Sequence, residues 1–413
     1  MPAPLEGESG MRAIYVIATL AAVLLVPALA RCQPPVPGAT AGGTGEAPKA
    51  LPPGVLAQFD LENEADVQGW APLVEGTTLS ITHEPANVRQ GQGALQFDYT
   101  PVEDYYLFQR GGLQVPGAKS LSFSVKATEK TPLLYGLGEG DGSAYDAFLE
   151  LPANKWVDVQ ANLADLQLRP GSVDENNQLD ADQLATVVFF DLCNMPGEDG
   201  RALGWKKGPQ KLWLDNVIIG TQEVPSVFRT EDLPNGKRRI VVADFESQVV
   251  RGLDVGGAVL DLVPADRGQA LKITYRVGPE RWSGVVLGLG SLDLRGLEQV
   301  KVRLKSAAKA AVNLVLEERG DKSHYERLLD LEGNGAWHSY EVPVAEFTLS
   351  ETSEDENGQL DPGELRVVIV VVDTYNAVVD AQGQGAVTAD DIELICGPAP
   401  GATQERTLAP ETK

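Results

Sequence analysis

Residues 172–184 read SVDENNQLDADQL, and residues 353–365 read SEDENGQLDPGEL. The Asp, Asn, Leu and Asp positions that the two stretches share lie 181 residues apart, and so do Trp156 and Trp337 upstream of them. A repeat of this length has the size of a whole domain, not of a solenoid repeat or a propeller blade. The repeated stretch therefore predicts that one domain occurs twice in the chain.

Short segments rich in β-branched and aromatic residues surround each copy of the repeat and alternate with Gly, Pro, Asn and Asp. Residues 121–127 (LSFSVKA) place Leu, Phe and Val on one face of a strand, and Ser and Lys on the other. The runs at 186–192 (TVVFFDL) and 365–373 (LRVVIVVVD) are continuously apolar, which is typical of a central strand buried on both faces. The pattern predicts an all-β protein with two tandem β-sandwich domains of the jelly-roll type.

Changes in composition along the chain predict its domain boundaries. The expected order is a signal peptide region (1–30), a Pro/Gly-rich linker (31–54), a first jelly-roll module (55–221), a linker (222–237), a second jelly-roll module (238–397) and a disordered tail (398–413).

The N-terminal region indicates export from the cytoplasm. Arg12 precedes an apolar run at 13–30 that ends in Ala-Leu-Ala, the pattern of a cleaved secretory signal. Two alternatives stay open, an uncleaved membrane-anchoring helix and a lipid attached to Cys32. In each case we expect a secreted or cell-surface protein.

The net charge of −25 opposes binding to nucleic acid or to an anionic membrane surface, because both are polyanionic. Cys193 and Cys396 either form a disulfide, if the fold brings them within reach, or remain thiols. No nucleophile elbow, phosphate loop or His-Glu-x-x-His motif occurs, so we expect a monomeric, non-catalytic protein.

The order of motifs resembles that of the galactose-binding-like jelly-roll modules, particularly the family 11 type of carbohydrate-binding module. The shared features are an opening Phe-Asp or Phe-Glu (59–60 and 245–246), Ala-Leu-x-x-x-Tyr (94–99 and 270–275), the Asp-x-Asn-x-x-Leu-Asp loop and a closing acidic strand. The resemblance covers about 55–221 and 238–397. It implies an exported protein that binds polysaccharide, and we keep as the alternative a structural or adhesive cell-surface protein that binds protein partners.

Such modules carry Tyr and Trp rings with Asp, Asn or Arg on a concave sheet face, where β-glucan chains stack. By position, the resemblance implies these carbohydrate-binding candidates: Tyr105, Tyr106, Arg110, Tyr135, Asp141 and Tyr145 in the first unit, and Trp282, Asp321 and Tyr325 in the second. The alternative is that the rings fill the sandwich cores. The resemblance also implies structural Ca²⁺ near the first and last strands, held by Asp60, Glu62 and Asp215 or by Asp244, Glu246 and Asp390.

The repeated loop has two interpretations. Asp355, Asn357, Asp361 and Glu364 match positions of a calcium-binding EF-hand loop when Gly358 is aligned with its invariant glycine. A turn built on hydrogen bonds of Asp and Asn side chains explains the same residues without a metal.

Overall fold

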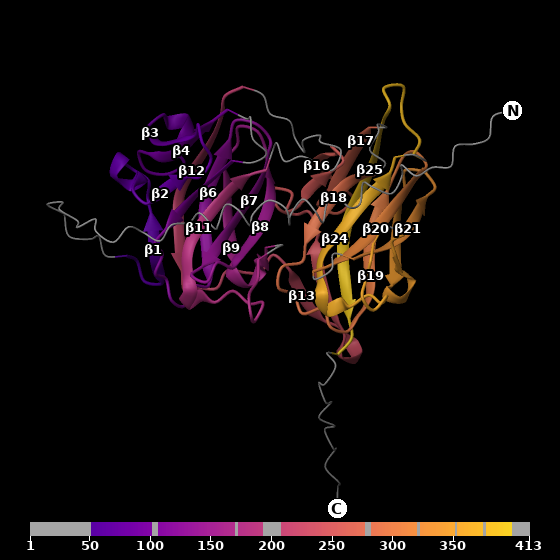
Figure 1. The fold of residues 1–413 in the computed structure, drawn as a ribbon. Helices are drawn as coiled ribbons and strands as arrows, with labels where there is room; N and C mark the ends of the chain where they lie inside the picture. The colour runs from indigo at the N-terminus through magenta and orange to yellow at the C-terminus, as the bar shows by residue number, and fades with distance from the viewer. Residues whose placement is uncertain are drawn as a thin grey trace, which may run out of the picture.

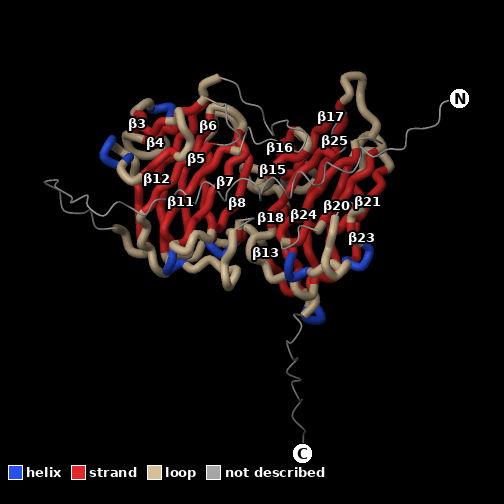
Figure 2. The backbone as a smooth tube through the Cα atoms, viewed as in Figure 1, coloured by secondary structure: helices blue, strands red, loops and turns tan. Residues whose placement is uncertain are grey.

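The computed structural model describes residues 51–100, 106–169, 172–192, 208–276, 282–319, 323–351, 353–374 and 377–398. Over these ranges the chain forms two successive β-sandwiches, and turns and loops connect the strands within each (Figures 1 and 2). This confirms the predicted all-β, tandem jelly-roll fold. None of the helices in these ranges is long and apolar enough to span a bilayer. The predicted signal segment, Cys32 and Cys193 lie outside the described residues, and Cys396 is a buried free thiol.

The first unit packs two antiparallel sheets face to face. Sheet I contains β3 (Thr78–Thr82), β4 (Ala94–Tyr99), β12 (Gln210–Gly220), β6 (Ser120–Ala127) and β9 (Val157–Asn162), with β1 (Val55–Phe59) paired to β12. Sheet II contains β10 (Gln167–Leu168), β8 (Ala144–Leu151), β7 (Thr131–Glu139), β11 (Leu184–Asp191), β5 (Tyr106–Gly111) and β2 (Trp70–Pro72).

The second unit repeats this arrangement. Sheet III contains β13 (Arg229–Asp232), β14 (Arg238–Ala243), β25 (Gln384–Cys396), β17 (Gln269–Arg276) and β16 (Val259–Pro264), while β19 (Leu297–Lys305) pairs with β25 and with β22 (Trp337–Pro343). Sheet IV contains β15 (Leu253–Val255), β18 (Trp282–Gly288), β24 (Leu365–Asp373), β20 (Ala310–Glu318), β21 (His324–Leu331) and β23 (Thr348–Leu349). Short 3₁₀ turns lie at η1 (Glu64–Val67), η2 (Pro85–Asn87), η3 (Leu163–Asp165), η4 (Ala181–Gln183), η5 (Pro234–Gly236), η6 (Val344–Glu346) and η7 (Pro362–Glu364).

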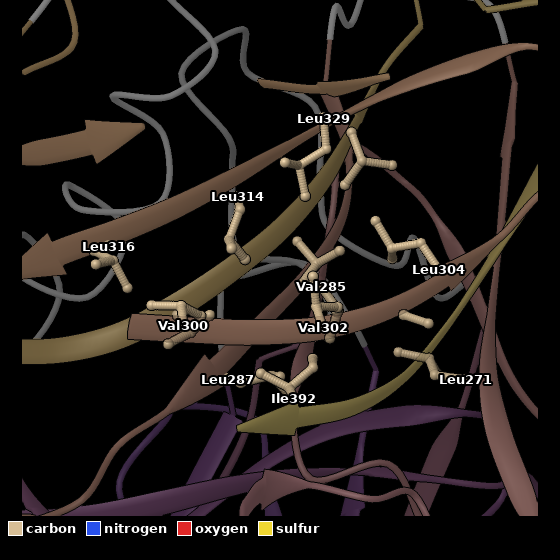
Figure 3. Close-up of a cluster of buried hydrophobic side chains, with 14 of the residues drawn as sticks. Leu271, Val285, Leu287, Val300, Val302, Leu304, Leu314, Leu316, Leu329 and Ile392 are labelled. Carbon is tan, nitrogen blue, oxygen red and sulfur yellow. The ribbon is translucent and has the colours of Figure 1, made fainter. Parts of the chain in front are cut away.

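A separate hydrophobic core fills each sandwich. In the second unit, Val302 of sheet III and Leu314 of sheet IV belong to one cluster between the sheets (Figure 3). The two continuously apolar runs form β11 and β24, which lie inside their six-stranded sheets as the sequence predicts. Each of these strands contributes one set of alternate side chains to the core and the other set to the outer face.

The repeated loop is fastened to its sandwich by the same contacts in both units. The hydroxyl of Tyr145 donates to Asp174, and the hydroxyl of Tyr325 donates to Asp355. In addition, Glu139 accepts the amide N–H at the end of its loop, from Asp180. Its counterpart Glu318 accepts the amide of Asp361 in the same way. The same Tyr–Asp and Glu–amide contacts thus hold the loop in both units, although the paired residues are one or two positions further apart in the second.

Residues 222–237, predicted to be a linker, are part of the folded structure. The carbonyl of Val224 accepts a hydrogen bond from Asn162, and the amide of Val227 donates to Asp165 at 2.8 Å. Phe228 is buried in the second core, and β13 extends sheet III. The prediction of a linker is therefore corrected, because residues of this segment form hydrogen bonds with the first unit and pack in the core of the second.

Sheets II and IV lie next to each other at the junction of the units. The amide of Glu150 on β8 donates to the carbonyl of Val250 at 2.9 Å, which sets the two sheets edge to edge (Figure 1). Phe148 of the first unit packs against an apolar cluster on the outer face of sheet IV, and Leu253 of the second unit packs against one on sheet II. The two units are therefore joined by reciprocal apolar contacts.

Candidate ligand groove and cation site

Three of the predicted ligand-face tyrosines lie inside the sandwiches. Tyr135 is buried with its ring centroid 5.1 Å from that of Phe123, and Tyr145 and Tyr325 are buried with their hydroxyls committed to the repeated loops. A sugar cannot stack on a ring whose faces are already covered by core side chains. The interpretation of these three residues as carbohydrate-binding is therefore corrected to core packing and loop anchoring.

The outer sheet faces do not form the expected aromatic platform. Trp282 is only 7% exposed and packs among Val and Ile side chains of β15, β18, β20 and β24. On sheet II the corresponding cluster is formed by Leu107, Leu134, Val188, Phe190 and Leu192. Buried polar groups on β8 and β24 are paired within the protein, as in the ion pair of Asp146 with Arg169 at 2.6 Å.

The remaining carbohydrate candidates divide into two groups. Tyr105 and Asp321 lie outside the described residues, and for Tyr106 the structure gives only the backbone, which pairs with Asp191 of β11. Asp141 closes the β7–β8 turn, where its Oδ1 accepts from the amide of Ser143 at 2.9 Å. None of these four is brought to the outer sheet faces by a described contact.

The structure does bring Asp60, Glu62 and Arg110 together. They line an open groove of about 390 Å³ beside η1, at the edge of the first sandwich. The other lining residues are Gln58, Phe59, Asn63, Ala65, Asp66 and Gln68. Six of the nine lining side chains are carboxylates or amides, so the groove offers many hydrogen-bond acceptors and several donors.

Arg110 is the unusual member of this groove. Its guanidinium lies over the ring of Phe59, with Cζ 5.1 Å from the centroid, and burial lowers its pKa. Nε and Nη1 are buried, and neither has a hydrogen-bond acceptor within the described ranges. Gly69 makes room for the guanidinium, because a Cβ at this position would lie 1.6 Å from Nη1. A buried guanidinium with unused donors is costly for folding, which points to a ligand-binding role.

The second unit has no counterpart of this arginine. Arg110 pairs with Val187 on β11, and Leu287 pairs with Val368, the residue of β24 that lies 181 positions later. Leu287 is buried in the second core. The register thus places an apolar core residue where the first unit has its unpaired guanidinium.

Glu62 links the groove to the predicted cation site. The amide of Gln92 donates to Glu62 at 2.6 Å, and the positive φ of 75° at Gly91 lets the carboxylate approach that backbone. Asp215, at the bulge of β12, is 1% exposed and accepts the amides of Arg89 and Gln90 on one oxygen only. Its other oxygen, Oδ1, is buried and has no described partner.

Asp60, Glu62 and Asp215 are not among the described carboxylates whose oxygens lie within 4.8 Å of one another, so the structure does not gather the predicted set of three, and the case for a cation here rests on Glu62 and Asp215 alone. Burial raises the pKa of Asp215, and the negative charge of Glu62 acts in the same direction. A cation between the two carboxylates would relieve both effects, and oxygen donors are the ligands that Ca²⁺ prefers. Asp60 lies on the groove side of this pair and accepts from Gln58.

The corresponding residues of the second unit are differently engaged. The amide of Gln269 donates to Glu246 at 2.9 Å, so Glu246 is the counterpart of Glu62, which corrects the predicted match of Phe245-Glu246 with Phe59-Asp60 by two residues. Asp244 is paired with Arg229 at 2.8 Å. Asp390 is paired with Arg303 at 3.0 Å and is therefore not open to a cation in the way that Asp215 is.

The loop at 353–365 has the contacts of a turn. The amide of Asn357 donates to Asp355 at 3.1 Å, its side-chain amide donates to Asp361 at 2.7 Å, and the amide of Gln359 donates back to its oxygen at 2.6 Å. The loop in the first unit has matching contacts. The oxygens required by the EF-hand interpretation are thus used within the turn, although Glu139, Asp141 and Asp174 do lie close enough together to hold an ion.

Comparison with known proteins gives structural likenesses only. No protein-family model matches the chain, and no curated protein matches it. The chain is similar to the family 11 carbohydrate-binding module of the cellulosomal cellulase Lic26A-Cel5E of Clostridium thermocellum, at 18% identity over 39% of this chain and 95% of that one, with a TM-score of 0.32.

It is also similar to the tandem CBM22-1-CBM22-2 domain of Xyn10C from Paenibacillus barcinonensis, at 14% identity over 83% of this chain and 97% of that one, with a TM-score of 0.26. For an exo-beta-agarase the values are 14% identity, 42% of this chain, 25% of that one and a TM-score of 0.31. At these identities and TM-scores the likeness assigns no ligand to this chain.

Proposed function

We propose that this is an exported, non-catalytic protein that binds polysaccharide, with its ligand held in the groove around Arg110 of the first unit. The observation that carries the proposal is Arg110, which lines a polar groove of about 390 Å³ and has two buried guanidinium nitrogens without a hydrogen-bond partner among the described residues. Sugar hydroxyls can accept from such donors and can donate to the neighbouring carboxylates and amides.

The charge of the groove favours a neutral sugar. Asp60, Glu62 and Asp66 line it beside a single arginine, in a chain of net charge −25. A uronic acid or sulfated polymer would meet like charge on all three sides. We therefore propose neutral β-glucans and xylans as the ligands to test first, the classes named for the mixed-linked tetrasaccharide complex and the xylan-binding domain among the similar structures.

The test is affinity electrophoresis of the full chain in gels containing mixed-linkage β-glucan, xylan, agarose or pectin. Arg110→Leu introduces the residue type found at the same register position in the second unit. It should weaken binding by about 10–100-fold, because two charged hydrogen bonds to a ligand are lost. Arg295→Leu is the matched control, since Arg295 is exposed and pairs only with nearby Asp293. A protein that no neutral polymer retards would overturn the proposal.

We also propose a structural Ca²⁺ in the first unit, held by Glu62 and Asp215. The unpartnered Oδ1 of Asp215 supports it. The ion would neutralise two buried or half-buried carboxylates and fix the segment before η1 against β12. A ligand bound only by the folded state raises its stability, so removal of the ion with a chelator should lower the melting temperature.

The second candidate function is a structural or adhesive role with a protein partner. It is favoured by the Val, Leu, Ile and Phe side chains of the outer faces of sheets II and IV, which are buried in the structure and offer few hydrogen-bonding groups to a sugar. Binding of the protein to cell walls treated with periodate or with protease separates the two functions. Periodate destroys sugar diols and should abolish polysaccharide binding, whereas loss of binding only after protease treatment would favour the second candidate.

A further inference from the structure

The bulge in the last strand carries an acidic residue in both units, but its neighbour differs. In the first unit Asp215 of β12 lies opposite Ser124 of β6. In the second unit Asp390 of β25 lies opposite Arg303 of β19. Both bulges have a residue with positive φ immediately after the aspartate, 50° at Asn216 and 46° at Asp391. The two sites are thus built on the same backbone feature.

Three carboxylates and one aromatic ring hold the side chain of Arg303 at this position. Its Nη1 donates to Asp390 at 3.0 Å and to Asp391 at 3.2 Å, and its Nη2 contacts both carboxylate oxygens of Asp266 at 3.0 Å. Its Cζ lies 4.7 Å from the centroid of the Trp337 ring. Trp337 thus makes a cation–π contact with Arg303. The guanidinium is only 13% exposed, so it is part of the interior of the site.

The first unit distributes its charges differently. Ser124 donates to Asp158 at 2.7 Å, and the guanidinium of Arg89 also binds Asp158. Among the described residues no arginine side chain hydrogen-bonds Asp215, although Arg89 interacts with it electrostatically. Asp215 accepts two backbone amides instead and keeps Oδ1 unused. An open carboxylate oxygen in one unit therefore corresponds to a carboxylate closed by a guanidinium in the other.

We infer that Arg303 takes the place of a metal ion in the second unit, so that the chain binds cation at Asp215 but not at Asp390. This inference rests on the proposed cation site of the first unit for the comparison, but it concerns Arg303 itself. A guanidinium uses the oxygens that would ligate an ion and repels a second positive charge. The ion-pair network is part of the chain, so the fold of the second unit does not depend on the calcium concentration.

The experiment is equilibrium dialysis of the full-length protein against ⁴⁵Ca²⁺ at physiological ionic strength, counting saturable sites relative to the wild type. Arg303→Ser installs the residue that the first unit has at this position. It should add one site, and adding Asp390→Asn to it should remove that site again. Asp390→Asn alone should leave the number of sites unchanged, and Asp215→Asn should reduce it by one.

The outcomes separate this inference from the proposal for the first unit. If Asp215→Asn removes no site while Arg303→Ser gains one, the calcium proposal for the first unit fails and the inference about Arg303 stands. A site lost in Asp390→Asn alone would overturn the inference. A folded Arg303→Ser protein that gains no site, with folding checked by near-ultraviolet circular dichroism, would also overturn it. The Asp390→Asn arm does not depend on the stability of the arginine variant.

Discussion

Removing the tyrosine hydroxyls that fasten the repeated loops should destabilise each unit by a predictable amount. Tyr145 is 1% exposed, and its hydroxyl donates to the half-buried carboxylate of Asp174. A hydrogen bond to a charged group contributes about 1.5–3 kcal/mol. For a domain of this size that corresponds to a decrease in melting temperature of roughly 3–12 °C in Tyr145→Phe. Tyr325→Phe should have an effect of the same order, because its contact to Asp355 is the same.

The loss of stability in Tyr145→Phe should depend on pH. The hydroxyl of Tyr145 holds the pKa of Asp174 below its usual value in the folded state. A carboxyl with a lowered folded-state pKa stabilises the protein above its unfolded pKa of about 3.9, and this contribution is lost as the pH falls through the folded-state pKa. The difference between wild type and Tyr145→Phe should therefore be full at pH 7 and should shrink below pH 4.

Calorimetry of the wild type and Tyr145→Phe at both pH values is the assay, with Tyr340→Phe as the control. The hydroxyl of Tyr340 donates to an exposed backbone carbonyl at 2.7 Å, so its removal should cost well under 1 kcal/mol. Asp174→Asn combined with Tyr145→Phe should cost less than the two single changes added together. Unchanged melting of Tyr145→Phe at pH 7, or a loss of stability that persists undiminished at pH 3, would refute the loop-anchor reasoning.

Three further perturbations follow from buried groups. Burial raises the pKa of Glu150, at the junction of the units, to about 7, so its ionisation opposes folding as the pH rises from about 4.5 to 7. The free energy of unfolding of Glu150→Gln, measured in urea, should therefore equal that of the wild type at pH 4. At pH 8 it should exceed the wild-type value by up to about 3 kcal/mol. Leu314→Ala should lose about 2–5 kcal/mol, because the side chain is fully buried between sheets III and IV, and equal urea midpoints would contradict this. A chelator should lower the melting temperature of the wild type and leave that of Asp215→Asn unchanged, whereas equal shifts would place the ion elsewhere.

The periodicity of the sequence was sufficient for the fold but not for the site. Alternating strands and two continuously apolar strands define a sandwich, and their central positions follow from burial on both faces. A continuously apolar strand, however, does not indicate which side chains face the core and which face outward. Tyr135 lies on β7, where every residue is buried, so no polar alternation distinguishes its core-facing side from the outer face. Tyr135, Tyr145 and Tyr325 were therefore assigned to the wrong side of the sheet, whereas Trp282 does lie on the outer face.

The loop anchors were visible in the sequence, although their meaning was not. Glu139, Ser143 and Tyr145 recur as Glu318, Ser323 and Tyr325 at almost the offset of the loop. The recurrence of these residues reflects hydrogen bonds between a strand and its loop, and carbohydrate recognition does not require it.

The Arg303 network could not be predicted in this way. Arg303 and Asp390 are 87 residues apart, and only the strand register across the β25 bulge brings them together. Arg110 was named as a candidate, but the absence of acceptors around its guanidinium is a property of the folded chain alone.

At two corresponding positions the first unit leaves buried polar atoms unpaired where the second does not, although both units contain other such atoms among the described residues. Where that unit has Arg110 with unpaired donors and Asp215 with an unpaired oxygen, the second has Leu287 in its core and Asp390 paired with Arg303. Each replacement removes a desolvated polar atom without a partner, and each such atom costs about 1–3 kcal/mol. Selection for stability alone would remove them from both copies. Their persistence in one unit is what a binding requirement would produce, since functional sites are where a fold retains groups that only a ligand satisfies. On the proposed function the second unit supports the first through the Phe148 and Leu253 contacts, and Leu253→Asp should lower the stability of the protein and leave the glycan affinity of the folded fraction unchanged.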